Sequence, residues 1–193
     1  MEGKPEAVVL VEGVSDRVAL EVVARRRGID LAGGGVSVVA MQGINNVGRF
    51  LAYYGATAPG VRVAGLYDAA EERFVRRGLD LEPSAASQSG SDLEARGFYC
   101  CSADLEDELI RALGPEAVVD LVAAEGELRS FRTLQKQPAL RARSLHDQLR
   151  RMMSGRSGGK KRYAALMAEA VAPEQVPRPL AQVLACALGD HHG

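Results

Sequence analysis

The chain has 193 residues, of which 47% are apolar and 25% are charged, and its formal net charge is −1. This composition excludes a largely disordered chain, and the length suits one domain with a helical appendage and a buried core. The longest aliphatic run near the start covers residues 7–11, far short of the roughly 20 residues of a membrane span. The first six residues are too acidic and polar for a secretory signal. We therefore expect a cytoplasmic protein that does not bind a membrane.

Charge is distributed unevenly along the chain. Residues 64–128 contain 15 acidic residues and five arginines, whereas residues 129–163 contain eight arginines and three lysines against the single acid Asp147. An acidic segment of this kind suits divalent cations, and a basic segment suits a polyanion such as nucleic acid. The alternative is that the two segments neutralise each other within one folded molecule.

Short apolar runs alternate with segments of helical periodicity over residues 6–113. The run at residues 6–12 is rich in β-branched residues, which is typical of a strand buried on both faces. A helix is predicted to begin at Ser15 or Asp16 and to end near Gly28. The next predicted elements are strand 35–41, helix 46–54, strand 61–67, helix 69–77, a polar mobile loop within 83–97, strand 98–102 and helix 105–113.

No strand-like run follows Pro115. The remaining sequence predicts helices at residues 116–125, 138–153, 160–171 and 178–188. Because strands alternate with helices, we predict an α/β fold with a mostly parallel sheet, helices on both faces and a C-terminal helical extension. The predicted domains are an α/β core at residues 1–128 and a basic helical extension at residues 129–193.

Carboxylates follow three of the four predicted strands. Glu12 ends the first strand, with Asp16 four residues later, and Asp68 ends the third. The further acids beyond the third and fourth strands are Glu71, Glu72, Asp104, Glu106, Asp107 and Glu108. Ligands of open parallel sheets bind beyond the carboxyl ends of the strands, where these acids are expected to lie. A cluster of carboxylates is the donor set that Mg²⁺ or Mn²⁺ prefers, so we predict a site for one or two such ions.

These residues resemble motifs of the TOPRIM domain, and more narrowly those of the OLD-family (overcoming lysogenization defect) nucleases. The segment Glu12–Asp16 is similar to the Glu-x-x-x-Asp motif of this branch, and Asp68 stands where its Asp-x-Asp pair begins. Residues 103–109 and 157–164 resemble its later acidic and basic elements. The likeness runs in order along essentially the whole chain and implies a TOPRIM-like sheet.

The resemblance implies a divalent-metal-dependent nuclease that hydrolyses phosphodiester bonds, with DNA as the expected partner. The candidate metal ligands are Glu12, Asp16, Asp68, Glu72, Asp104 and Glu106. The candidate catalytic residues are Glu12 and Lys160. Lys160 follows a glycine turn, and a cation there would oppose the charge that develops in phosphoryl transfer. The alternative for Lys160 is ordinary helix surface.

The basic stretch supplies the expected contacts to nucleic acid. The candidates are Arg141, Arg143, Arg150, Arg151, Arg156 and Lys161. With four phenylalanines, five tyrosines and no tryptophan, the chain has little material for stacking on bases, so we expect contacts to phosphates.

The chain departs from the family pattern in two ways. Its second motif reads Asp68-Ala69-Ala70, which lacks the second carboxylate, and Glu71 or Glu72 is a candidate replacement. OLD nucleases usually carry an ATPase domain before the TOPRIM domain, whereas this sequence contains no Gly-x-x-x-x-Gly-Lys-Ser/Thr motif. We therefore expect a standalone TOPRIM domain, with any ATPase as a separate chain.

Three other functions are compatible with the sequence. A nucleotidyl transferase or primase-like enzyme would use the same metal site. A non-catalytic module would bind metal or nucleic acid through a degenerate site, and a regulatory subunit would partner a separate ATPase. The sequence is also compatible with a homo-oligomer.

Overall fold

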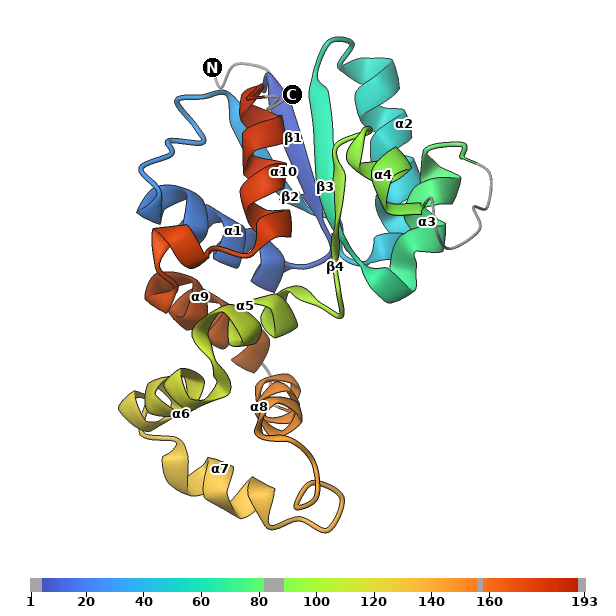
Figure 1. Ribbon diagram of the computed structural model, residues 1–193. Coiled ribbons are helices and arrows are strands. Elements are labelled where there is room, and N and C mark those ends of the chain that lie inside the picture. Colours follow the sequence, from blue (N-terminus) through green and yellow to red (C-terminus); the bar gives the residue numbers. More distant parts are fainter. Residues whose placement is uncertain (1–4, 82–88, 156–157, 191–193) are drawn as a thin grey trace.

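A computed structural model of the chain describes residues 5–81, 89–155 and 158–190 (Figure 1). Its centre is a sheet of four parallel strands in the order β2-β1-β3-β4. The strands are β1 (Ala7–Val11), β2 (Val36–Ala40), β3 (Arg62–Asp68) and β4 (Phe98–Cys101). Each lies within two residues of its predicted position, and the predicted α/β fold with a mostly parallel sheet is confirmed.

The sheet is buried on both faces, which explains the continuous apolar sequence of β1. Side chains from one face of β1 pack with α1 (Val14–Arg26) and α10 (Arg178–Leu188). Those from the other face pack with α2 (Val47–Thr57), α3 (Glu72–Gly78) and α4 (Ser89–Glu94). Figure 1 shows these two groups of helices on opposite sides of the sheet. All carboxyl ends of the strands therefore reach one edge between the two helical layers.

Five further helices continue from that edge. They are α5 (Leu105–Leu113), α6 (Pro115–Ala124), α7 (Leu128–Gln135), α8 (Leu145–Ser154) and α9 (Gly159–Ala170). In Figure 1, α6, α7 and α8 project away from the sheet, whereas α9 lies beneath α1. Helix α9 packs against α1 and α5, and α10 returns to cover β1, β3 and β4. We call α6, α7 and α8 the arm. Residues 129–193 thus include α9 and α10 of the core as well as α7 and α8 of the arm.

Several helices differ from their predicted positions. Helix α8 begins only at Leu145, because the side chain of Ser144 accepts a hydrogen bond from the Asp147 N–H (3.1 Å) and caps the helix. Helices α7 and α4 were not predicted. Residues 83–88 of the predicted mobile loop lie outside the described residues.

The described residues also form three short 3₁₀ turns. They are η1 (Ile44–Asn46), η2 (Ala69–Glu71) and η3 (Pro173–Gln175). Turn η2 separates β3 from α3, where a single helix over 69–77 was predicted. Among the described residues, none of the helices combines the length and the apolar composition needed to cross a lipid bilayer.

Candidate metal centre

Three carboxylates meet where neighbouring strands β1 and β3 end. Glu12 directly follows β1, Asp68 is the last residue of β3, and Glu71 closes turn η2. One oxygen atom from each of these side chains lies within 4.8 Å of the other two. All three side chains are half-buried. The parallel pairing of β1 with β3 brings Glu12 and Asp68 together although 56 positions separate them in sequence.

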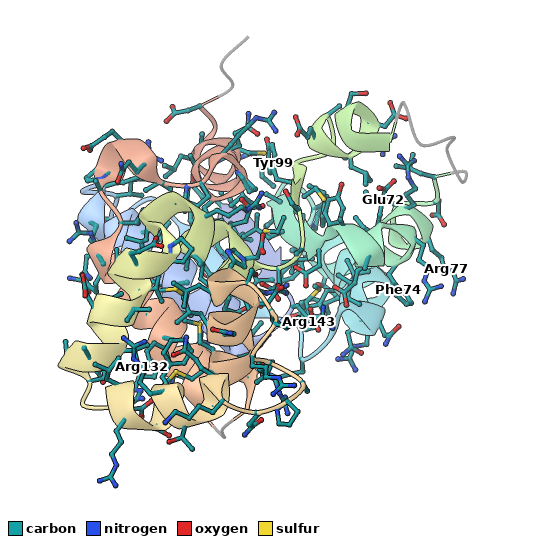
Figure 2. The ribbon with its side chains drawn as sticks, turned by 60° about the horizontal axis from the view of Figure 1, so that its bottom comes forward. Glu72, Phe74, Arg77, Tyr99, Arg132 and Arg143 are labelled. Carbon is teal, nitrogen blue, oxygen red and sulfur yellow. The ribbon has the colours of Figure 1, made fainter. Side chains whose placement is uncertain are left out.

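Turn η2 decides which acid after Asp68 joins this group. The chain makes a 3₁₀ turn through Ala69 and Ala70 before α3 starts, and the turn carries Glu71 to the cluster. Glu72 instead pairs within α3, where its Oε1 lies 2.6 Å from Nε of Arg76. Figure 2 shows Glu72 on the α3 side of the molecule, together with Phe74 and Arg77. The structure therefore brings Glu71 to the cluster and does not bring Glu72 there.

Asp16 stands beside the three grouped carboxylates. It lies in the first turn of α1, where its Oδ2 accepts a hydrogen bond from the Gly13 N–H (2.7 Å). This bond stabilises the carboxylate form, but burial has the larger effect and raises the pKa of Asp16 to about 6. The charges of Glu106 and Glu12 raise it further. Asp16 thus both caps the helix and adds negative charge to the site.

The carboxylates of the cluster destabilise one another's charged forms. Burial, followed by the charges of Glu71 and Asp104, raises the pKa of Asp68 to about 8. Burial and the charge of Glu12 raise the pKa of Glu71 to about 7. At neutral pH the carboxylates of Asp68 and Glu71 are therefore partly protonated unless a metal cation takes the place of the protons.

The chemistry of the cluster fits a divalent metal ion. Its donors are carboxylate oxygens, the ligands that Mg²⁺ and Mn²⁺ prefer. The Oε2 atom of Glu71 is buried and has no hydrogen-bond partner among the described residues. A buried carboxylate oxygen left unpaired in this way is costly, and coordination of a cation would compensate the cost. Glu12, Asp68 and Glu71 are the residues that would hold the ion.

A second group of charges lies at the start of α5. Glu106 is 3% exposed, and its Oε2 is 3.4 Å from Nζ of Lys160 at the start of α9. Its other carboxylate oxygen is buried without a partner among the described residues. Burial raises the pKa of Glu106. Burial alone would lower the pKa of Lys160, but the charges of Glu106 and Asp104 outweigh it and raise the value. Lys160 is thus a fixed ammonium group beside the acidic edge.

Asp104 caps α5 and also pairs with the arm. Its Oδ1 accepts a hydrogen bond from the Asp107 N–H (2.8 Å), and its Oδ2 pairs with the guanidinium of Arg150 on α8. On the same helix, His146 places Nε2 2.6 Å from Oδ1 of Asp107. Asp104 is therefore already paired with a cation, whereas the three grouped carboxylates form no ion pair with any described residue.

The predicted nucleic-acid contacts divide into two kinds. Arg150 neutralises acids of α5, as the alternative explanation of the charge asymmetry required. Four others have exposed side chains and form no ion pair with any described residue: Arg141, Arg143, Arg151 and Lys161. Arg143 precedes α8 in the arm (Figure 2). Arg156 lies outside the described residues.

Known proteins share both this sequence pattern and this fold. The family model for the "Overcoming lysogenization defect protein-like, TOPRIM domain" matches residues 6–69, which include Glu12, Asp16 and Asp68. The resemblance to an OLD-like TOPRIM domain is confirmed. No curated protein is significantly similar to the chain in sequence.

Solved structures extend the OLD likeness to nearly the whole chain. The C-terminal region of the OLD protein of Xanthomonas campestris pv. campestris matches with a TM-score of 0.75 and 22% identity, covering 98% of both chains. The C-terminal region of the Burkholderia pseudomallei OLD protein matches with a TM-score of 0.71 and 17% identity, covering 95% of this chain and 96% of that one. The chain therefore has the fold of these C-terminal regions, including the helical arm.

The raised pKa values predict how the stability of the metal-free protein depends on pH. Asp68 and Glu71 keep protons in the folded state up to about pH 7–8, whereas the unfolded chain releases them near pH 4. The stability that these two groups contribute is fully present below their pKa in the unfolded chain. It is lost as the pH rises through their pKa values in the folded protein. We expect the melting temperature in EDTA to fall between about pH 5 and pH 8, and to fall less steeply in Asp68→Asn. An equal slope in both proteins would contradict this assignment.

Proposed function

We propose that the chain is a divalent-metal-dependent nuclease of the OLD-like TOPRIM type that hydrolyses phosphodiester bonds in DNA. The observation that carries the proposal is the meeting of Glu12, Asp68 and Glu71 within 4.8 Å at the sheet edge. The match of residues 6–69 to OLD-like TOPRIM domains supports it. When bound, Mg²⁺ or Mn²⁺ would activate water and stabilise charge on the phosphodiester oxygens.

The residues around the cluster have separate roles in this proposal. Glu12, Asp68 and Glu71 hold the ion, and Asp16 supports them from the first turn of α1. Lys160, held against buried Glu106, faces the charge that develops on the transferred phosphoryl group.

The arm supplies further charge for binding. The exposed Arg141, Arg143 and Arg151 of the arm, together with Lys161 at the start of α9, contact phosphates and set the affinity for DNA rather than the chemistry.

The position of Glu71 accounts for the missing second carboxylate of the Asp-x-Asp pair. Ala70 has no side-chain oxygen, but Glu71 follows it directly and brings a carboxylate to the same cluster. Glutamate has a longer side chain than aspartate. Together with the 3₁₀ turn of η2, this length lets Glu71 reach the cluster although it stands one residue later than the second aspartate of the pair. The donor set is thereby restored to three carboxylates in the described part of the chain.

A matched pair of variants tests the metal site. Because losing a hydrogen-bond partner of a metal ligand already costs about 10- to 100-fold in metal affinity, we expect Glu71→Gln to cost at least as much. Glu72→Gln removes the same charge one residue later and should leave metal affinity unchanged, since Glu72 pairs with Arg76. Calorimetric titration with Mn²⁺ measures both. Equal losses in the two variants would show that Glu71 is not a specific ligand.

A plasmid-nicking assay tests the activity. Nicking should occur with Mg²⁺ or Mn²⁺, stop in EDTA and be strongly reduced in Glu71→Gln but not in Glu72→Gln. Metal binding without nicking under any of these conditions would favour the non-catalytic, regulatory alternative.

A further inference from the structure

A cavity of about 570 Å³ opens beside the metal centre, on the α3 side. Ala69 and Ala70 of turn η2 form part of its wall, and the rest comes from α3 and from Leu81. Ala69 and Ala70 lie in the chain between Asp68 and Glu71, so this part of the cavity wall directly links two residues of the carboxylate cluster. In Figure 1, α3 lies on the opposite side of the strand ends from α9, which carries Lys160. None of the predicted nucleic-acid contacts that the structure describes lines this cavity.

The lining of the cavity is positively charged. Arg73, Arg76 and Arg77 are spaced so that they share one face of α3, and all three line the cavity. The side chain of Arg76 is only 7% exposed, which is unusual for a charged group, and it pairs with Glu72. Glu72 is the one acid among the described lining residues, so the described part of the lining carries three arginines and one carboxylate.

The side chains that line the cavity favour binding of a phosphate group. Guanidinium groups form paired, charge-assisted hydrogen bonds to phosphate oxygens, and a buried arginine limits the ways such an anion can sit. The guanidinium carbon of Arg73 lies 4.7 Å from the centre of the Phe74 ring, which restricts the side chain before any ligand binds. Ala69 and Ala70 add no negative charge to the cavity wall. An aspartate at position 70, as in an Asp-x-Asp pair, would add one.

We propose that the α3 cavity is a phosphate subsite that holds the nucleic-acid strand on one side of the metal centre. The identity of the ligand rests on the proposed function, because the phosphate is one belonging to the substrate. The subsite and the Lys160 side would then flank the carboxylate cluster. A strand crossing the cluster would be held by cations on both sides, with the reacting phosphate between them.

Arginine variants with a matched control test the subsite. Arg73→Ala and Arg77→Ala, singly and combined, remove exposed side chains whose loss should not unfold the protein. Arg49→Ala is the control, because Arg49 is an exposed residue of α2 that lies over Phe50 (5.5 Å) as Arg73 lies over Phe74, but it is outside the cavity. DNA binding is measured by fluorescence anisotropy in EDTA at several salt concentrations, so that cleavage does not enter.

We expect Arg73→Ala and Arg77→Ala, but not Arg49→Ala, to flatten the slope of log affinity against log salt. The slope should fall by about one unit for each phosphate that the protein no longer neutralises. A comparison of short DNA with and without terminal phosphates shows whether the bound phosphate lies within the strand or at its end. Weaker binding of both forms indicates a phosphate within the strand, and weaker binding of the phosphorylated form alone indicates a strand end. Either result supports the subsite.

Slopes and affinities in Arg73→Ala and Arg77→Ala equal to those of Arg49→Ala would overturn the subsite, whether or not the wild-type protein cuts DNA. In contrast, a protein that binds DNA through α3 but shows no metal-dependent nicking would retain the subsite and refute the nuclease. The two proposals can thus fail separately.

Discussion

Asp68→Asn is expected to abolish tight binding of divalent metal while leaving the fold intact. Asparagine keeps the size of the side chain but removes the charge at the end of β3, between Glu12 and Glu71. Wild-type protein should be stabilised by metal, by about 2.7 kcal/mol at a free metal concentration 100 times the Kd, and Asp68→Asn should not show this stabilisation. Thermal melts with and without Mn²⁺ measure the difference, and calorimetry measures the affinity directly.

The metal-free protein provides the control for Asp68→Asn. Without metal, the variant should be at least as stable as the wild type above about pH 8, because a buried charge among like charges has been removed. A variant that unfolds in EDTA would show a structural role for Asp68. Equal Mn²⁺ affinity in both proteins would contradict the proposed site.

Lys160→Ala is expected to reduce cleavage far more than it reduces DNA binding. The ammonium group of Lys160 is held by Glu106 beside the acidic edge, so its charge is in place before the reaction begins. Removing one preorganised group that stabilises transition-state charge costs about 10²- to 10³-fold in rate. Single-turnover cleavage should show this loss, and gel-shift titration should show a change in affinity no larger than that of removing one surface charge.

Lys161→Ala is the matched control for Lys160. Lys161 is the next residue on α9, is exposed and forms no ion pair with any described residue. Its substitution should affect binding through its charge and leave the single-turnover rate near the wild-type value. Equal effects of the two substitutions on the rate would show that Lys160 acts only as surface charge. Melting curves should accompany the assay, since Lys160→Ala leaves buried Glu106 without its partner.

The fold was predictable because its signals are local. A strand buried on both faces has an unbroken apolar sequence, as at residues 7–11, and an amphipathic helix shows its periodicity within a few turns. The prediction failed where a local signal was weak. The Ser144 cap sets the start of α8 at Leu145, and the polar sequence of α7 did not show that Phe131 anchors it in the core.

The sequence prediction named Glu72 among the metal ligands, whereas the structure groups Glu71 with Glu12 and Asp68. Glu71 and Glu72 are chemically identical neighbours, and both follow a strand end at a suitable distance. The difference arises from the 3₁₀ turn at Ala69 and from the i to i+4 pairing of Glu72 with Arg76. That pairing is visible in the spacing of the sequence and was the available signal against Glu72.

The amino-acid sequence was enough to predict the fold class and the edge at which the acids gather, because parallel strands place all their carboxyl ends on one side. Which charges meet depends on how the helices pack. Arg150 reaches Asp104 across 46 positions and Lys160 reaches Glu106 across 54, since α8 and α9 pack against α5. A sequence pattern shows which residues share one face of a helix. An ion pair between two helices depends on how those helices pack in the folded protein. The packing of α8 and α9 against α5 therefore decides which basic residues pair with the protein's own acids and which stay exposed.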